Sequence, residues 1–317
     1  MFLIKPSYQI LAASNKRDLP YSYDNPEYLI EAAGRTCYKS EDKITKDSAI
    51  KFIEMIKNRG HYSVTEHSWE LRYYESNTIP RYKFLNYMPI YIGGVLVAGN
   101  QRAFDEWDFE DKDNHDKYSD LIPSIFIGEI KDKQRWDMYS ATVKFICDRG
   151  VSHEIVRHRP PAFSQESTRY CNYSKDKFGN QLTYIIPPWV ELEEGEYLIK
   201  NDSNWEGNFK YFIKDYELIK GNKSEENWMN SLAFSEQNYN SLIEDGWKPE
   251  QARSILPNSL KTEIVVSCDL QEWKHIFKLR TSPAAHPQMR ELMIPLYEDF
   301  KKLYPEVFKG ENEECTE

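Results

Sequence analysis

The sequence predicts a chain that mixes helices and strands along its length. Apolar residues recur at helical spacing in 46–59 and 287–304, which is typical of helices that bury one face. Polar and apolar residues alternate in Lys261–Cys268, as in a strand with one buried face. Glycine and proline stand beside these stretches, where they commonly mark the ends of elements. We therefore expect a chain of mixed helices and strands, whose length suits one large domain or two smaller ones.

The elements of the first half follow from local signals. Residues 1–13 predict a strand and a turn, and Pro26 fits the first turn of a helix over 26–36 because no N–H partner is required there. The helix over 46–59 ends at Gly60, a residue type that often follows a helix. Alternation then predicts a strand in Trp69–Tyr74, and Ile90–Ala98 is expected to be a strand pair or a strand with a bulge. We expect a helix to begin at Gly99 and the acidic run Asp105–Asp120 to be a solvated loop.

The elements of the second half are better marked. Threonine, valine and aromatic residues predict a strand in Ser140–Cys147, and a short helix follows over Val151–His158. Aromatic and aliphatic residues through 206–245 predict one or two long helices that end at Gly246. The remaining expected elements are a helix over Pro249–Pro257, the strand Lys261–Cys268, helices over Leu270–Arg280 and 287–304, and a polar tail at 310–317.

Composition narrows the class of protein. The chain has 317 residues, enough to bury a sizeable core, and its hydrophobic fraction of 40% is ordinary for a globular protein. Its net charge of −10 argues against general binding to nucleic acid, which favours a basic surface. A local basic site in an acidic chain suggests a small anionic ligand instead.

Cysteine usage and the N-terminus suggest a reducing compartment. The five cysteines form no CxxC pair, and Met1–Lys5 is too short an apolar run for a signal peptide. The sequence also contains no apolar stretch of the length that spans a membrane. We therefore expect a cytoplasmic protein with free thiols and no contact with membranes.

The densest cluster of chemistry-bearing residues is Arg157–Tyr170. Pro160 and Pro161 exclude a continuous helix, so Arg157-His158-Arg159 ends one element and Ser164–Tyr170 forms a loop or begins the next. Arginine is suited to bidentate recognition of phosphate, and hydroxyl or backbone donors near it could hold the same anion. The alternative is a solvated basic loop, which is what most charge runs are.

A second cluster lies in Gly60–His67, just after a predicted helix. It holds a hydroxyl, a carboxylate and two histidines, of which His61 and His67 could equally be surface or structural residues. Their spacing is not that of a zinc site, so we expect no metal. The chain also lacks a glycine-rich phosphate loop, which makes common dinucleotide or P-loop sites unexpected. A site that binds ligands and takes its chemistry from a cofactor fits these residues better.

These segments together resemble the flavin-dependent thymidylate synthases. The signature is Arg157-His158-Arg159, seven further residues and then Ser167. Four weaker matches occur in the same order as in the family, namely Arg35–Ser40, Gly60–His67, Ala252–Pro257, and Leu279-Arg280 followed by Ala285–Arg290. Agreement of five segments across most of the chain makes coincidence a poor explanation.

The resemblance implies a fold and a reaction. The fold would be a single catalytic domain over residues 1–309, of the α+β class, with an antiparallel sheet flanked by helices. The reaction would methylate dUMP at C5 to dTMP, with methylenetetrahydrofolate as carbon donor, FAD as carrier and NADPH as reductant. The family forms homotetramers with shared active sites, so an oligomer is expected. Two rival readings are a flavin-binding relative without folate chemistry and a non-enzymatic nucleotide- or RNA-binding module.

The resemblance also implies site residues by position. Arg280 would face the uracil edge and favour ionisation at N3, which makes it the candidate catalytic residue. Contacts to dUMP are expected from Glu154, Arg157, Gln165, Glu166, Ser167, Thr168, Arg169, Arg253 and Arg280. Contacts to FAD are expected from His61, Ser63, Glu66, Arg157, His158, Arg159, Gln165, Asp269, Gln271 and His275.

The chain departs from the family pattern in three places. In the first, Val64-Thr65 replaces a usual Pro-Leu or Pro-Phe pair. Gln271 and Asp269 stand where the family often has arginine and asparagine. The segment 68–137 is much longer than in compact members and is expected to be an insertion. Since insertions usually lie on surface loops, an extended surface hairpin is the favoured reading of this segment. A cap over the active site, an extension of the sheet or an altered interface are the alternatives.

Overall fold

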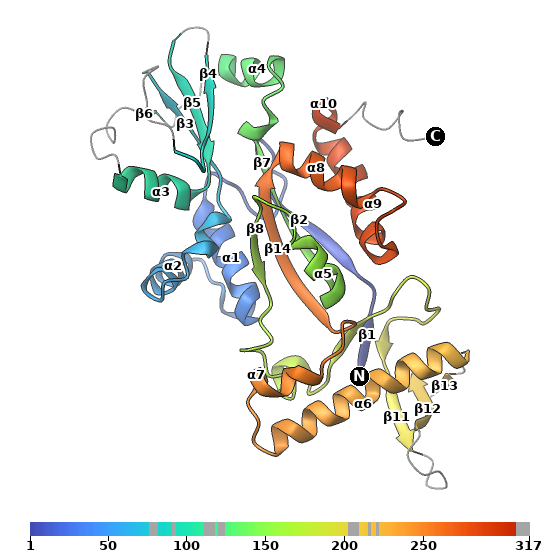
Figure 1. Ribbon diagram of the computed structural model, residues 1–317. Helices are drawn as coiled ribbons and strands as arrows, with labels where there is room; N and C mark the ends of the chain where they lie inside the picture. The colour runs from blue at the N-terminus through green and yellow to red at the C-terminus, as the bar shows by residue number, and fades with distance from the viewer. Residues whose placement is uncertain are drawn as a thin grey trace. The chain divides into compact units, whose positions relative to one another are not determined.

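The computed structural model describes residues 1–75, 82–90, 93–110, 118–119, 124–201, 209–214, 217–219 and 222–308. It contains helices and strands throughout, which confirms the α+β class (Figure 1). The chain divides into two compact units, and each is described by itself. The first holds 1–7, 145–157 and 165–264, and the second holds 8–144, 158–164 and 265–317. The polar tail predicted at 310–317 lies outside the described residues.

One four-stranded sheet has the order β2-β7-β14-β8, and one of its strands, Ala162–Gln165, lies within the signature segment. Its strands are β2 (Ser7–Ala13), β7 (Ser140–Asp148), β14 (Lys261–Asp269) and β8 (Ala162–Gln165). Each of these strands contributes residues to both units. The predicted strands over 140–147 and 261–268 are therefore confirmed, and the predicted first strand is divided into β1 (Phe2–Ile4) and β2 around Pro6.

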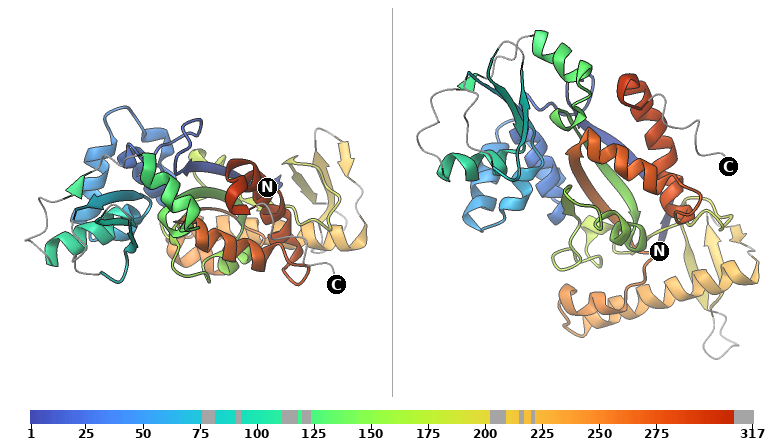
Figure 2. Two further views of the ribbon diagram at one scale, coloured as in Figure 1. Left: turned by 90° about the horizontal axis from the view of Figure 1, so that it is seen from above. Right: turned by 45° about the horizontal axis from the view of Figure 1, so that its top comes forward.

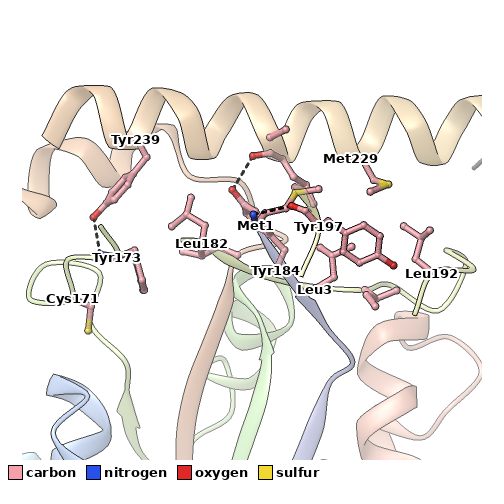
Figure 3. Packing of buried hydrophobic residues seen from close by; sticks show 14 of the residues in the cluster. Met1, Leu3, Cys171, Tyr173, Leu182, Tyr184, Leu192, Tyr197, Met229 and Tyr239 are labelled. Atoms are coloured by element: carbon pink, nitrogen blue, oxygen red, sulfur yellow. Dashed lines mark hydrogen bonds between the residues drawn. The ribbon is translucent and has the colours of Figure 1, made fainter. Parts of the chain in front are cut away.

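The first unit is organised around the long helix α6 (Lys223–Glu244). Its apolar side chains, among them Met229 and Leu232, pack in one buried cluster with Leu3 of β1 and Tyr184 of β9 (Thr183–Ile185), as Figure 3 shows. β1 pairs parallel with β9 and antiparallel with β10 (Gly195–Glu196). Asn222 begins α6 with a capping box in which its side chain accepts from the backbone of Glu225. The first unit also contains α5 (Arg149–Ile155), α7 (Pro249–Ala252) and the 3-10 turn η6 (Arg253–Ile255).

The prediction of helix throughout 206–245 is wrong in its first part. Phe209–Lys214 forms β12 and Glu217–Ile219 forms β13, and both belong to an antiparallel sheet with β11 (Leu198–Asn201). The aromatic and branched residues of this stretch favour a strand, and pairing with β11 decides between the two periodicities. Only the second part of the stretch forms the predicted helix, which is α6.

The second unit surrounds its part of the four-stranded sheet with helices. α1 (Pro26–Tyr38) packs Leu29 and Ala33 against Leu11 of β2 and Val265 of β14. α2 (Ala49–Asn58) packs against α1 through a cluster that includes Phe52 and Ile56. α8 (Leu270–Arg280) lies beside α9 (Pro287–Leu303), as the views of Figure 2 show, and Trp273 donates from α8 to the Ala141 carbonyl of β7. The short helix α10 (Pro305–Phe308) also packs on α9.

The 68–137 segment forms a small sheet of its own with the order β4-β5-β3-β6. Its strands are β3 (Glu70–Tyr74), β4 (Asn86–Pro89), β5 (Val95–Gly99) and β6 (Tyr118–Ser119). β3 pairs antiparallel with β5 and β6, and β4 pairs antiparallel with β5. The helix α3 (Gln101–Glu110) covers it with Phe104 and Trp107, and α4 (Ser124–Asp132) follows. The predicted acidic loop is wrong over 105–110, because these residues continue α3. The described residues of the segment thus form a packed sheet and helix, and for them the expected surface hairpin is wrong.

Candidate functional site

The Arg-His-Arg signature begins where α5 ends. Asp148 caps this helix by accepting a hydrogen bond from Val151 N at 2.7 Å. Arg157 is exposed and belongs to the first unit, whereas His158 is buried and Arg159 is exposed in the second. The turn after α5 therefore alternates an exposed cation, a buried imidazole and another exposed cation.

The first unit contains a cationic hollow of about 540 Å³. Arg149, His153, Thr168 and Arg253 line it, together with the carboxylate Glu250. Arg253 Nη1 donates to Thr168 Oγ1 at 3.2 Å, which joins the 3-10 turn η6 to the loop after β8. Arg169, from the same loop, is exposed. Exposed guanidinium groups and a hydroxyl at one hollow are the groups that bind a phosphate.

Sequence reasoning missed Arg149 and His153, although a signal was present. Arg149, His153 and Arg157 are spaced at i, i+4 and i+8, so a continuous helix would place them on one face. In the structure Arg149 Nη1 also donates to the Glu166 carbonyl and to Thr262 Oγ1, both at 3.4 Å. Arg149 thus lines the hollow and contacts the loop that carries Thr168.

The residues at the start of that loop make internal contacts. Gln165 Nε2 donates to Ser152 Oγ at 2.8 Å and to Thr262 Oγ1 at 3.2 Å, which holds its amide between α5 and β14. Glu166 is only 2% exposed. Its carboxylate accepts from Lys261 Nζ at 2.8 Å and from Tyr173 Oη at 3.0 Å, and its N–H donates to the Glu263 carbonyl at 2.8 Å.

These contacts form a buried charge cluster below the loop. Lys261 Nζ also lies 2.5 Å from Glu263 Oε1, so one ammonium serves two buried carboxylates. Burial lowers the pKa of Lys261, but Glu166 and Glu263 outweigh it, and the net shift is upward. The Glu166 side chain therefore points into the first unit. Its hydrogen bonds hold the start of the loop that carries Ser167, Thr168 and Arg169.

In the second unit, Arg280 and His158 are in direct contact. Arg280 Nε donates to His158 Nε2 at 2.9 Å, so the imidazole accepts on this nitrogen. Burial, Arg280 and His275 lower the pKa of His158 to about 4. Its Nδ1 lies 3.9 Å from Glu272 Oε1, but a neutral imidazole makes this contact no ion pair. A neutral His158 orients the guanidinium of Arg280 at the end of α8.

Glu272 is the unusual carboxyl of this cluster. Its Oε1 atom is buried and has no hydrogen-bond partner among the described residues. Burial, with a smaller effect of the charge of Asp269, raises its pKa to about 7. The folded protein therefore favours the protonated form of Glu272 relative to the unfolded chain.

We expect Glu272→Gln to remove a pH-dependent cost of folding. Because the pKa of Glu272 rises from 4.5 to about 7 on folding, its ionisation destabilises the wild type progressively from pH 4.5 to about 7 and by a constant amount above that. The free energy of unfolding of Glu272→Gln relative to wild type should increase by about 1–3 kcal/mol between about pH 4.5 and about pH 8. Urea titrations at both pH values measure this.

The matched control for this experiment is Glu298→Gln, which removes an exposed carboxylate paired with Lys301 on α9. Such a surface pair contributes little, so the difference from wild type should stay within about 0.5 kcal/mol at both pH values. If the free energies of unfolding of Glu272→Gln and wild type change equally with pH, burial does not raise the pKa of Glu272.

The second unit also holds a cavity of about 450 Å³. Three residues of the predicted flavin site line it, namely Glu66, Arg159 and Asp269. Asp269 caps α8 by accepting from Glu272 N at 2.8 Å, and burial raises its pKa to about 6. The cavity is also lined by Trp69 and Phe84, two aromatic side chains from the 68–137 segment.

The other predicted flavin residues have different surroundings. His61 Nδ1 lies 2.9 Å from the Tyr38 hydroxyl of α1. Ser63, Gln271 and His275 are exposed, and the ring of His275 lies edge-on to that of His158 at 6.3 Å. His67, in contrast, is fully buried, and its Nδ1 lies 2.8 Å from Ser267 Oγ. Burial lowers the pKa of His67 to about 3, so it is a neutral core residue.

Two features bear on other classes of site. Within the described ranges, no group of three or more His, Cys, Asp or Glu side chains is arranged to hold a metal ion. None of the helices formed by those residues is both long and apolar enough to span a membrane.

Comparisons with known proteins agree on one family. Residues 95–306 match the family model Thy1, described as thymidylate synthase complementing protein. A flavin-dependent thymidylate synthase of Pyrococcus horikoshii is 28% identical over 224 residues, which cover 69% of this chain and 79% of the relative. Those of Pyrococcus abyssi and Saccharolobus solfataricus are each 25% identical over 224 residues, covering 70% of this chain and 79% and 72% of the relatives.

Among solved structures, a UMP/dUMP methylase, PolB of Streptomyces cacaoi bound with 5-Br UMP, is 19% identical to the chain. The alignment covers 57% of this chain and 80% of PolB, with a TM-score of 0.41.

Proposed function

Because the chain belongs to the Thy1 family of thymidylate synthase complementing proteins, we propose that it is a flavin-dependent thymidylate synthase. The reaction is methylation of dUMP at C5 to give dTMP. The carbon donor is methylenetetrahydrofolate, the carrier is FAD and the reductant is NADPH. The observation that carries this proposal is that predicted site residues line two hollows with suitable chemistry. Thr168 and Arg253 line the cationic hollow of the first unit, and Glu66, Arg159 and Asp269 line the aromatic and polar cavity of the second.

The hollow of the first unit suits the phosphate of dUMP. Arg253 lines it beside Thr168, and Arg169 is exposed on the same loop. Guanidinium groups bind phosphate oxygens in pairs, and the Ser167 and Thr168 hydroxyls can donate to the same group. Arg149 lines the same hollow and adds to this set. We assign Glu154, Arg157 and Gln165 to the rest of the nucleotide, and Glu166 to bracing the loop.

The cavity of the second unit suits a flavin. Its volume falls in the range of small-ligand sites, and it combines aromatic walls with a few polar groups. Glu66, Arg159 and Asp269 would hold FAD there. When bound there, FAD would supply the electron-transfer and one-carbon chemistry of the proposed reaction.

Arg280 is the candidate catalytic residue. Its Nε is bonded to His158, which fixes the direction of the guanidinium, and the pyrimidine edge of dUMP is the proposed partner of the terminal nitrogens. A cation at this edge stabilises negative charge on the ring as N3 loses its proton, and this charge makes C5 nucleophilic. A neutral His158 is needed for this arrangement, because an imidazolium would repel the arginine. Arg280 thus lowers the activation barrier by placing a positive charge beside the ring on which negative charge develops.

We also propose a homotetramer with shared active sites, which the family resemblance supports. Light scattering of the purified protein tests this, and a monomeric mass under assay conditions would contradict it.

The experiment that tests the function is release of tritium from dUMP labelled at C5, with methylenetetrahydrofolate and NADPH present. The proposal predicts release that depends on both co-substrates and on FAD. Bound FAD without release would favour the flavin-binding relative that has lost folate chemistry. Absence of flavin together with bound RNA would favour the non-enzymatic nucleotide- or RNA-binding module, against which the net charge of −10 already argues.

A further inference from the structure

The 68–137 segment forms one wall of the cavity in the second unit. The cavity is lined by Glu66, Arg159, Pro160, Ala162, Ser140, Ser267, Cys268 and Asp269, and also by nine residues of the 68–137 segment. Those nine are Ser68, Trp69, Lys83, Phe84, Asn86, Asn100, Arg102, Ala103 and Glu106. The segment therefore supplies about half of the lining of the proposed flavin site.

Arg102 connects this wall to the Gly60–His67 segment. Its Nη1 donates to Glu66 Oε1 at 2.6 Å, and its Nε donates to Glu106 Oε1 at 2.8 Å. The Tyr82 hydroxyl donates to the other oxygen of Glu106 at 2.6 Å. Hydrogen bonds from Tyr82 and Arg102 lower the pKa of Glu106, and that carboxylate in turn holds Arg102 in place. The result is a chain of charge-assisted hydrogen bonds that ends on Glu66.

The backbone where α3 begins reinforces this connection. The N–H of Gln101 donates to Ser68 Oγ at 2.7 Å, and Asn100 caps the helix by accepting from Ala103 N at 2.9 Å. Since Arg102 is in the first turn of α3, its position is fixed by this cap. Glu66 is therefore oriented by a helix of the 68–137 segment and not only by its own turn.

Phe84 gives the wall an aromatic surface. It lines the cavity, yet 57% of its surface is exposed, which is unusual for so apolar a side chain. Lys83 Nζ lies 4.6 Å from the centre of its ring. Trp69 lines the cavity as well and is fixed by donation from Nε1 to the Met138 carbonyl at 2.9 Å. Two aromatic side chains near the cations Lys83 and Arg159 suit a ligand that joins a planar ring to phosphate groups.

We propose that the 68–137 segment is part of the flavin site, with Phe84 as the surface on which a planar ring of FAD packs and Arg102 as the positioning residue of Glu66. This inference rests on the proposed function. It explains why the segment folds as a packed sheet and helix, because a wall must be rigid to select a ligand by shape.

The test compares the affinity of the whole protein for FAD in variants of the wall. Phe84→Ala should raise the Kd for FAD about fivefold to tenfold, since an aromatic pair contributes this much beyond burial. Arg102→Gln should raise the Kd for FAD about tenfold, because Glu66 loses its charged partner. The Kd of Arg102→Lys should lie between those of Arg102→Gln and wild type. Quenching of flavin fluorescence measures Kd, and a change in the visible spectrum of bound flavin reports on Glu66.

Two matched controls lie outside the cavity. Trp247→Ala removes an aromatic side chain that is 46% exposed, and Arg135→Gln breaks an ion pair with Asp137 inside the same segment. Both should bind FAD within about twofold of wild type. Binding of dUMP and the melting temperature, measured on every variant, distinguish a local loss of affinity from misfolding.

The outcomes separate the inference from the function on which it rests. If the wild type binds no FAD even when FAD is added in large excess, the proposed function is overturned. If the wild type binds FAD and both wall variants bind it equally well, only the inference fails. A change confined to the KM for methylenetetrahydrofolate, with the Kd for FAD unchanged, also overturns the inference, because the wall would then belong to the folate.

Discussion

Replacing Arg280 with alanine should lower the turnover number by about 100- to 1,000-fold while FAD stays bound. The loss corresponds to removing one preorganised charge from the site where negative charge develops, and single donors of this kind contribute about that factor. The guanidinium is half-buried and is held by His158 at 2.9 Å, so water cannot substitute for its fixed direction. Steady-state tritium release measures turnover, and the visible spectrum measures bound flavin.

The matched control for Arg280 is Lys278→Ala on the last turn of the same helix. Lys278 is exposed, and its removal should change turnover less than about twofold. Near-normal turnover in Arg280→Ala would show that the uracil edge has another partner. Loss of flavin from that variant would show instead that Arg280 serves the cofactor.

Replacing Lys261 with methionine should be the most destabilising change in the first unit. It would leave Glu166 and Glu263, both nearly buried, without the ammonium that now lies 2.8 Å and 2.5 Å from their carboxylates. Removal of one partner from a buried ion pair typically costs about 3–5 kcal/mol. The loop after β8 should also loosen, so the affinity for dUMP should fall in the protein that remains folded. Urea unfolding and calorimetric titration with dUMP measure the two effects.

The control for Lys261 is Lys57→Met, which breaks an exposed pair with Asp105 and should cost less than about 1 kcal/mol. A second test is to combine Lys261→Met with Glu166→Gln and Glu263→Gln. Neutralising the stranded carboxylates should recover a large part of the lost stability, because the cost comes from uncompensated charge. If Lys261→Met alone unfolds at the same urea concentration as wild type, the ion pairs of Lys261 with Glu166 and Glu263 do not stabilise the protein.

Local sequence signals were enough for most of the regular elements. Pro26 at the start of α1, and the apolar period of α9, are properties of short stretches and need no distant partner. The stretch 209–219 could not be assigned in this way, because its aromatic residues suit a helix or a strand, and the antiparallel partner β11 decides. The sheet inside 68–137 was partly predicted as separate strands, but their pairing was not.

The candidate site was predictable as a set of residues but not as a set of contacts. The resemblance named Glu166 and Arg280, yet no local pattern could show that Glu166 pairs with Lys261, 95 residues away, or that Arg280 bonds His158, 122 residues away. Such contacts depend on how strands and helices pack. The same reason explains why the role proposed for 68–137 could not be read from the sequence, since that proposal rests on the contact between Arg102 and Glu66.

The measurement that most directly tests the central claim is the visible absorption spectrum of the purified protein after saturation with FAD and gel filtration. A flavin-dependent synthase should retain the bands of oxidised flavin, and these should bleach when NADPH is added without oxygen. A protein that keeps no flavin through the column, while a melting curve shows that it is folded, would contradict the account.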